Sequence, residues 1–281
     1  MLKTLALITK HPLTRERPLG AVWRFLRWQL ESRLREEVEF DWIVGARLAV
    51  RNGMTGATGN IYCGLHEFVD MALLLHMLRP GDLFVDVGAN IGSYTVLASK
   101  VCGANTIAVE PDPGTAASLR KNVELNDIRA LAEVHQCALG AENGQIGFTV
   151  GLDTMNRVDI SASGGGQVVP LRTLDELLEG RQPILLKLDV EGFEEQVLAG
   201  ARHTLAAPCL IAVETELESA LVESVLIDAG FSRAWYNPFS RALSDRPLEV
   251  KASNSLYIRN PRELEGRLIS APRRDVLGVR L

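Results

Sequence analysis

The sequence predicts an α/β fold in which helices cover both faces of a mostly parallel sheet. From Leu83 onward, short apolar runs alternate with segments of helical periodicity. These runs leave no room for a solvated face, which is typical of buried parallel strands. A glycine-containing turn follows the first run and opens a helix, so free backbone N–H groups there would face a bound ligand.

Composition limits the possible functions. The chain has 281 residues, of which 47% are apolar and 23% charged, and this suits one large α/β domain with an extension. A net charge of −5 without a Lys/Arg-dense segment argues against a nucleic-acid binder. The four cysteines form no C-x-x-C pair, and no stretch resembles a signal peptide or a transmembrane span. We therefore expect a cytoplasmic protein with no nucleic-acid partner and no transmembrane segment.

The N-terminal region is predicted to be helical over residues 1–40, because apolar side chains recur there at helical spacing. They are Val22, Phe25, Leu26, Leu30, Leu34 and Val38. Such a helix would pack on the rest of the chain or on a second subunit, and a basic amphipathic segment at a membrane surface is the alternative. Residues 41–50 then predict a small hairpin, and the turn-rich residues 51–60 predict a flexible lead-in.

A helix is predicted over residues 62–78, ending at the breakers Pro80 and Gly81. His66 and Glu67 lie near its start. An acid in the first helical turn complements the helix dipole, so Glu67 has a structural explanation. The functional alternative places Glu67 beside a ligand at the following turn, and both explanations stay open.

The turn after the first parallel strand predicts the ligand class. Asp86 closes the strand, and Gly88, Asn90 and Gly92 follow at alternate positions, a pattern suited to left-handed backbone. Neither the dinucleotide fingerprint G-x-G-x-x-G nor the phosphate-binding G-K-[ST] is present. The Asp86 carboxylate would repel a pyrophosphate, but it suits a ligand with an amino group and a sulfonium, such as S-adenosylmethionine.

The next strand, over residues 105–109, ends at Glu110. A carboxylate about 20 residues beyond the turn binds the ribose hydroxyls in doubly wound folds. The alternative is a surface acid at the end of a strand. Because Glu110 accompanies Asp86 at this spacing, we favour ribose binding.

The remaining elements continue the alternation of strand and helix. We expect helices over residues 114–125, 193–205 and 219–229, and strands over 134–139, 144–150, 184–190, 210–215 and 255–258. A Gly/Ser loop over residues 161–167 is expected to cover substrate. The fourth parallel strand ends at Asp189, in the place where open sheets present groups to ligands. The tail from Arg262 to Leu281 shows no strong periodicity.

Three segments carry a specific resemblance. Residues 85–95, 109–113 and 186–194 resemble, in order, the successive motifs of the FkbM family of S-adenosylmethionine-dependent methyltransferases. Shorter segments at 122–126, 138–140 and 169–175 also match, and the resemblance covers residues 62–215. It implies a class I methyltransferase (Rossmann-like) fold, with a mostly parallel seven-stranded sheet and an N-terminal helical extension. We divide the chain into a helical and hairpin extension at 1–79, a methyltransferase domain at 80–260 and a tail at 261–281.

The resemblance also implies an activity. The expected reaction is O-methylation of a hydroxyl on a sugar, on a glycolipid or polysaccharide precursor, or on a secondary metabolite. The residues expected to bind S-adenosylmethionine are Asp86, Gly88, Ala89, Asn90, Gly92, Glu110, Pro111, Ala138, Leu139 and Asp189. An alcohol acceptor loses a proton, so a base is needed within hydrogen-bond reach. The candidate catalytic residues are Asp189 and Glu191, with Glu67 and His66 behind them.

Several alternatives stay open. A divalent metal held by Asp189, Glu191 and Glu214 could activate the hydroxyl instead, although we expect no metal site. A nucleotide-dependent oxidoreductase or a catalytically silent cofactor-binding protein would use the same fold. The expected partners are a small-molecule or carbohydrate acceptor and, as an option, a second copy of the chain.

Overall fold

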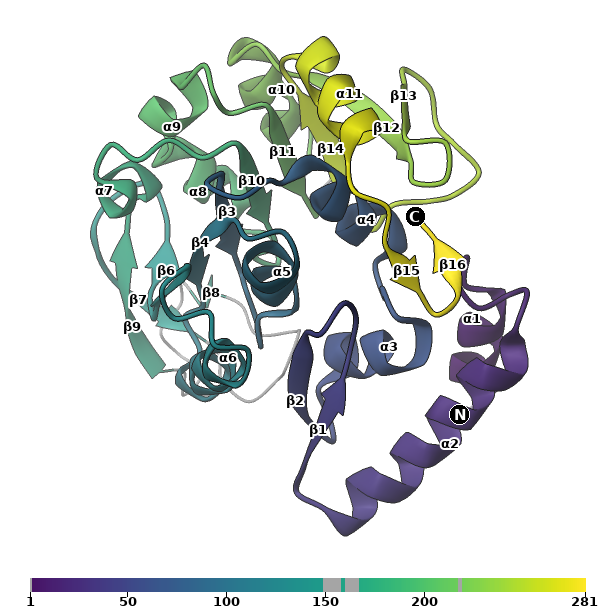
Figure 1. The fold of residues 1–281 in the computed structure, drawn as a ribbon. Helices are drawn as coiled ribbons and strands as arrows, with labels where there is room; N and C mark the ends of the chain where they lie inside the picture. Colours follow the sequence, from purple (N-terminus) through teal and green to yellow (C-terminus); the bar gives the residue numbers. More distant parts are fainter. Residues whose placement is uncertain (1, 149–157, 160–166, 217–218) are drawn as a thin grey trace.

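The computed structural model describes residues 2–148, 158–159, 167–216 and 219–281. Its centre is one large sheet (Figure 1). The strands are β3 (Leu83–Val87), β4 (Asn105–Val109), β5 (Ala132–His135), β10 (Leu185–Leu188), β11 (Ala212–Thr215), β12 (Ser232–Asn237), β13 (Ala242–Ser244) and β14 (Ser255–Ile258). Their order across the sheet is β13-β12-β14-β11-β10-β3-β4-β5.

The pairing is mostly parallel, as predicted. Strands β5, β4, β3, β10 and β11 are parallel neighbours, and β14 then runs antiparallel between β11 and β12. These seven strands make up the predicted sheet. The eighth, β13, is a three-residue strand that pairs antiparallel with β12 at the edge, because the chain turns back at Pro238.

Side chains alternate between two covered faces. Phe84, Leu185 and Ala212 pack with α4 (Phe68–Met77) and α11 (Pro261–Ser270). Val85, Leu186 and Val213 point to the opposite face. The helices packed on that second face are α7 (Leu174–Leu178), α8 (Glu194–Ala199), α9 (Arg202–Ala206) and α10 (Ala220–Asp228). Helices on both faces explain why the strands carry almost no solvated positions.

The helix after β3 changes its winding part-way along. Helix α5 (Ser93–Val96) passes into a π-helical turn, η1 (Leu97–Val101), and α6 (Pro113–Leu125) follows β4. Helix α6 begins with Asp112, whose side chain accepts the backbone N–H of Thr115. That cap fixes the start of the helix beside the end of β4.

The N-terminal region departs from the prediction in four places, the first of which is a break in the predicted helix at residues 11–17. It contains α1 (Leu2–Lys10), α2 (Pro18–Leu34), a hairpin of β1 (Glu37–Asp41) and β2 (Arg47–Arg51), and α3 (Thr55–Cys63). The helix expected through residue 40 ends at Leu34, because the hairpin already begins at Glu37. The expected lead-in at 51–60 contains α3, and the helix expected from residue 62 begins at Phe68. Packing decides these boundaries, since Ala57, Tyr62 and Cys63 are buried with Phe25 and Trp28 of α2.

The side of α2 that is buried differs from the side that the apolar residues of the sequence predicted. Ala21, Phe25 and Trp28 are buried. Trp23, Leu26, Leu30 and Leu34 are exposed, together with Leu19 at the start of the helix. In Figure 1, α2 runs along the outside of the molecule with one side against β1 and α3.

A second, smaller sheet lies beside the main one. Its strands are β6 (Ala138–Leu139), β7 (Gly144–Phe148), β8 (Val158–Asp159) and β9 (Gln167–Arg172), in the order β6-β9-β7-β8. The single strand predicted over residues 134–139 is therefore divided, because β5 ends at His135 and β6 pairs with β9. The predicted Gly/Ser loop lies outside the described residues except for Gln167, which begins β9.

The C-terminal tail is folded onto the core. Leu264 and Leu268 of α11 are fully buried against the α4 face, and Arg267 forms a 2.7 Å ion pair with Asp82. The hairpin of β15 (Asp275–Val276) and β16 (Val279–Arg280) follows. The division at residues 79 and 260 stays a prediction, and the hydrophobic cores run across both positions. No helix in the described part of the chain is long and apolar enough to cross a membrane.

Candidate active site

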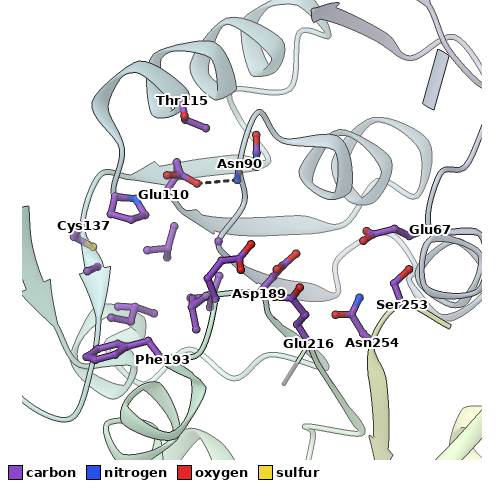
Figure 2. A pocket seen from close by; sticks show the side chains of 18 residues that line it. Glu67, Asn90, Glu110, Thr115, Cys137, Asp189, Phe193, Glu216, Ser253 and Asn254 are labelled. Atoms are coloured by element: carbon purple, nitrogen blue, oxygen red, sulfur yellow. Dashed lines mark hydrogen bonds between the residues drawn. The ribbon is translucent and has the colours of Figure 1, made fainter. Parts of the chain in front are cut away.

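A cavity of about 270 Å³ opens at the carboxyl ends of β3, β4 and β10 (Figure 2). This is the edge where open parallel sheets bind ligands. The segments after these three strands form one part of the wall, and β6 forms another. Ser253 and Asn254, which precede β14, close the far side.

The turn after β3 is held in one conformation by its neighbours. Gly88 has φ +77°, and a Cβ there would lie 1.8 Å from the backbone oxygen of Asp189. No other residue type fits so close to a backbone atom. Gly88 and Ala89 donate their N–H groups to the oxygen of Val109 at 2.9 and 3.0 Å. Asn90 adopts the left-handed conformation that the sequence predicted for it, with φ +51°.

Glu110 ties this turn to the end of β4. Its Oε2 accepts the Asn90 N–H and its Oε1 accepts the Asp112 N–H, both at 2.9 Å; Figure 2 shows the first of these bonds. The side chain also lines the cavity, where burial raises the pKa of Glu110 to about 7. Each carboxylate oxygen has a further acceptor site, so Glu110 is able to bind hydroxyl groups of a ligand as well.

An apolar slot adjoins Glu110. Pro111, Leu139 and Phe193 line it, with the small residues Cys137 and Ala138. Ala138 and Leu139 are nearly fully buried, so little more than their cavity-facing atoms is accessible. This part of the cavity suits a flat apolar ring.

A row of charged side chains crosses the sheet below the turn. Lys187 on β10 pairs in register with Asp86 on β3 and with Glu214 on β11. All three residues are only 1% exposed. The ammonium of Lys187 donates to Asp189 Oδ2 at 2.5 Å and lies 4.6 Å from the centre of the Tyr94 ring. One buried cation is therefore surrounded by carboxyl groups.

The pKa values in this row diverge. Burial raises the pKa of Asp86 to about 6, and its Oδ2 accepts the Thr95 hydroxyl at 2.7 Å. Burial raises the pKa of Glu214 well above its usual range, and its Oε2 has no partner among the described residues. Burial therefore favours the neutral form of Glu214.

Asp189 and Glu216 form a carboxyl pair at the wall of the cavity. Burial opposes the ionisation of Asp189, but the Lys187 ammonium outweighs it and holds the pKa of Asp189 below its usual value. Burial and then the Asp189 charge raise the pKa of Glu216 to about 8. The protonated Glu216 hydrogen-bonds to the ionised Asp189. Their side chains lie next to each other in Figure 2.

A smaller cavity of about 100 Å³ adjoins the first. Asp86, His66 and Ala89 line it, and the two cavities share Gly88, Asn90, Asp189 and Glu67. Glu67 precedes α4 and accepts the Tyr94 hydroxyl at 2.7 Å. Burial lowers the pKa of His66, so its ring is neutral near pH 7.

Most of the residues expected at the site line one of these cavities. Seven of the expected cofactor residues line the larger one: Gly88, Asn90, Glu110, Pro111, Ala138, Leu139 and Asp189. The candidate catalytic residues Glu191 and Glu67 also line it, whereas Asp86, Ala89 and His66 reach only the smaller cavity. Gly92 lines neither cavity. It starts α5 with φ +90°, and a Cβ there would meet Leu119. The roles of all these residues stay predictions.

Sequence reasoning gave no role at the site to several residues that the fold brings here. They are Lys187, Phe193, Glu216 and Asn254. Lys187 and Phe193 stand inside the matched segment 186–194, next to residues that were selected, and that proximity was an available signal. For Asn254 the sequence offered no signal.

Comparison with known proteins decides the family. The family model described as "Methyltransferase FkbM domain", which represents the sequences of that family, matches residues 86–231, just over half of the chain. The chain belongs to the FkbM methyltransferase family. Its members are S-adenosylmethionine-dependent methyltransferases. The class I methyltransferase fold predicted from the sequence is confirmed by the order and direction of the strands.

Individual relatives match parts of the chain. Hexuronic acid methyltransferase AglP from Haloferax volcanii is 31% identical over 50% of this chain and 59% of its own length. Methyltransferase 1 from Beauveria bassiana is 33% identical over 43% of this chain and 59% of its own length. The 31-O-demethyl-FK506 methyltransferase FkbM from Streptomyces tacrolimicus is 41% identical over 27% of this chain and 30% of its own length. The chain thus spans less than two thirds of each of these relatives.

Proposed function

We propose that this protein binds S-adenosylmethionine across the two adjoining cavities and transfers its methyl group to a hydroxyl of a sugar or a related metabolite. The observation that carries the proposal is Glu110, which is fixed by the turn after β3 and faces the cavity. Family membership supports it, as do the activities for which two relatives are named, a hexuronic acid methyltransferase and a 31-O-demethyl-FK506 methyltransferase.

The residues that line the two cavities fit the separate parts of S-adenosylmethionine. Glu110 offers carboxylate oxygens to the two ribose hydroxyls. The slot at Pro111, Leu139 and Phe193 suits the adenine ring. Glu67 and Asp189 line both cavities and Asp86 lines the smaller one, and negative charge there suits an amino group and a sulfonium. Bound S-adenosylmethionine would supply its methyl group, with the positive charge of the sulfonium, to a nucleophile that approaches in line with the sulfur–methyl bond.

The protein's own contribution to the reaction is to place the acceptor and take its proton. Asp189, the base predicted from the sequence, is ionised but stabilised by Lys187, so it is a weak base. Glu216, with a pKa of about 8, already carries a proton at neutral pH, so Asp189 is the member of the pair that is able to accept the proton of the hydroxyl. We therefore propose that the Asp189–Glu216 pair accepts the proton of the acceptor hydroxyl. The pair holds one proton before the reaction and two after it.

Calorimetry tests the binding step. We expect S-adenosylmethionine to bind in a one-to-one ratio and Glu110→Ala to weaken binding by about 2–3 kcal/mol, because two charge-assisted hydrogen bonds to ribose are lost. Glu124→Ala, on the outer part of α6, is the matched control and should bind like the parent. Equal affinity of the Glu110 variant would show that the ribose assignment is wrong. Binding of NAD instead would favour the oxidoreductase alternative.

A second copy of the chain is the partner we propose for α2. The exposed residues Leu19, Trp23, Leu26 and Leu30 are spaced four, three and four apart, which is the a/d spacing of a two-helix seam. The cytoplasmic location and the absence of a nucleic-acid partner remain predictions from composition.

A further inference from the structure

A third cavity, of about 450 Å³, lies next to the larger of the two cavities that we assign to S-adenosylmethionine. Glu216, Ser253 and Asn254 line both of them. The walls of the third cavity come from α4, β12 and the segment 247–256. A molecule bound there would lie beside the Asp189–Glu216 pair, because Glu216 belongs to both walls.

Much of the wall of the third cavity is apolar. Val69 and Leu73 come from α4 and Leu256 from β14, and all three are nearly fully buried. Leu248 and Val250, from the segment before β14, are half-buried. Walls of this kind suit the carbon skeleton of a small ring.

Asn254 brings an unpaired donor to this cavity. Its backbone N–H and that of Ser253 donate to the two carboxyl oxygens of Asp70, at 3.1 and 2.9 Å, and so fix the segment against α4. Asn254 is only 7% exposed, and its Nδ2 has no hydrogen-bond partner among the described residues. A buried donor without an acceptor is costly and rare in folded proteins. The amide therefore needs an acceptor atom from a ligand, and Figure 2 shows Asn254 next to Glu216.

Glu214 brings a second unpaired group to the same cavity. It is 1% exposed, and its Oε2 has no partner within the part of the chain that the structure describes. Strand β11 pairs with β14 at Glu214↔Leu256 and Thr215↔Ser255. In this register Asn254, the residue before β14, lies diagonally across from Glu214. Both side chains line the third cavity, so two unpaired polar atoms from neighbouring segments face one space.

Hydroxyl groups are the ligand chemistry that satisfies both atoms. A hydroxyl oxygen accepts the amide N–H of Asn254. A second hydroxyl forms a hydrogen bond with Glu214 whether that carboxyl group is ionised or protonated, because a hydroxyl both donates and accepts. An ammonium group has no lone pair to offer Asn254.

The acids of the wall disfavour an anionic ligand. Asp70, Glu214 and Glu216 all line the third cavity, and a carboxylate brought next to them is opposed by each one that is ionised. Of the two cations in the wall, Lys251 is exposed to solvent and Arg233 already contacts side chains of β12 and β14. An uncharged ligand fits this lining best.

We propose that the third cavity binds the methyl acceptor, and that the acceptor is an uncharged ring with two neighbouring hydroxyl groups. The first hydroxyl accepts the Asn254 amide N–H beside the Asp189–Glu216 pair, and the second hydrogen-bonds to Glu214. The oxygen of the first hydroxyl takes the methyl group, the sulfur keeps the electron pair of the broken bond, and the hydroxyl proton passes to Asp189. This inference rests on the proposed methyltransferase function and adds the class of its acceptor.

Three cyclohexane derivatives test the acceptor class. A vicinal diol, trans-1,2-cyclohexanediol, is compared with cyclohexanol and with trans-2-hydroxycyclohexanecarboxylate. Each is titrated into the full-length protein saturated with S-adenosylhomocysteine, and ligand-observed NMR gives the Kd. The diol should bind about fivefold more tightly than cyclohexanol or better, because it makes one further hydrogen bond. The hydroxycarboxylate should bind no better than cyclohexanol. Equal binding of the diol and cyclohexanol, no binding of the diol, or tightest binding of the hydroxycarboxylate would each overturn the acceptor assignment.

Variants of the two unpaired residues separate the two hydroxyl contacts. Asn254→Leu and Asn254→Asp both remove the amide donor, and they should weaken the diol and cyclohexanol by a similar factor. Glu214→Leu should weaken only the diol, to the level of cyclohexanol. Asn237→Asp is the matched control outside the cavity lining, and it should bind like the parent, because a carboxylate still accepts the backbone N–H groups that Asn237 Oδ1 accepts. A diol preference retained in Glu214→Leu, or parent-like binding in both Asn254 variants, would contradict the proposal.

The same samples distinguish this failure from failure of the proposed function. S-Adenosylhomocysteine binding is measured first by calorimetry, in the parent and in each variant. Its absence from the parent would overturn the methyltransferase proposal, and the acceptor assignment with it. Retained binding without a preference for the diol would overturn the acceptor assignment alone.

Discussion

At the scale of single residues, Lys187 determines how the acids around it ionise. It is the buried cation in a row with Asp86 and Glu214, and it hydrogen-bonds to Asp189. One ammonium stabilises only part of the surrounding negative charge, so Asp189 stays ionised while Glu216, with a pKa of about 8, keeps its proton at pH 7. Burial raises the pKa of Glu214 as well. This division gives the proposed active site an ionised group and a proton carrier side by side.

Substitutions in the carboxyl pair test this assignment. With an acceptor that the parent protein methylates, we expect Asp189→Asn to lower kcat by about 10²–10⁴, the usual effect of losing one positioned base. Glu216→Gln should cause a loss of similar size and should remove an ionisation near pH 8 from the pH–rate profile. S-Adenosylmethionine affinity should change much less in both variants. Normal turnover in Asp189→Asn, or only a lowered melting temperature, would remove that residue from the catalytic set.

The sequence predicted those site residues that follow a strand directly. Glu110 and Asp189 end strands of a parallel sheet, and the carboxyl ends of such strands meet at one edge. The contact between Glu214 and Lys187 depends on sheet register, and Asn254 depends on its contact with Asp70 on a distant helix. Spacing within one segment holds no information on either contact.

At the scale of elements, the strands were easier to predict than the N-terminal helices. Buried strands such as β3 and β10 are continuous apolar runs, so their sequence alone identifies them. Helix α3 contains Gly56 and Gly59, two poor helix formers, and it forms because its other residues pack against α2. On α2, the apolar residues outnumber those that the monomer buries, and composition alone did not show which side faces the core.

The exposed stripe on α2 gives a prediction at this scale. We expect the protein to be a dimer in solution and the double substitution Leu26→Glu/Leu30→Glu to make it monomeric, because buried carboxylates in a two-helix seam are costly. Light scattering after size-exclusion chromatography measures the mass. Ser32→Glu on the same helix, outside the seam spacing, is the control and should leave the dimer intact. A parent protein that is monomeric at tens of micromolar would rule out the seam.

At the scale of the whole molecule, stability should depend on pH in a characteristic direction. Burial raises the pKa of Asp70 and Glu110 to about 7 and of Glu216 to about 8, above the ordinary values of 3.8 and 4.5. The folded protein thus binds more protons than the unfolded chain, and this contribution to stability is lost as the pH rises through 7 and 8. The buried histidines His11, His66 and His76 have lowered pKa values, so their protonation affects stability only below pH 6.5.

We therefore expect the melting temperature of the ligand-free protein to fall by several degrees between pH 7 and pH 9. Differential scanning calorimetry at constant ionic strength measures it. Glu110→Gln, which does not titrate, should show a smaller fall. A melting temperature that rises over this interval would contradict the raised pKa values.

The crowding of carboxyl groups around Lys187 also bears on how the proposed catalytic cycle ends. The methyl donor arrives with a positively charged sulfur, whereas the spent thioether is uncharged at that atom. Asp189 and its acidic neighbours therefore attract the incoming molecule more strongly than the outgoing one. The ribose and adenine contacts are the same for both. A site built in this way favours exchange of the used donor for a fresh one, so the protein should resist product inhibition as S-adenosylhomocysteine accumulates.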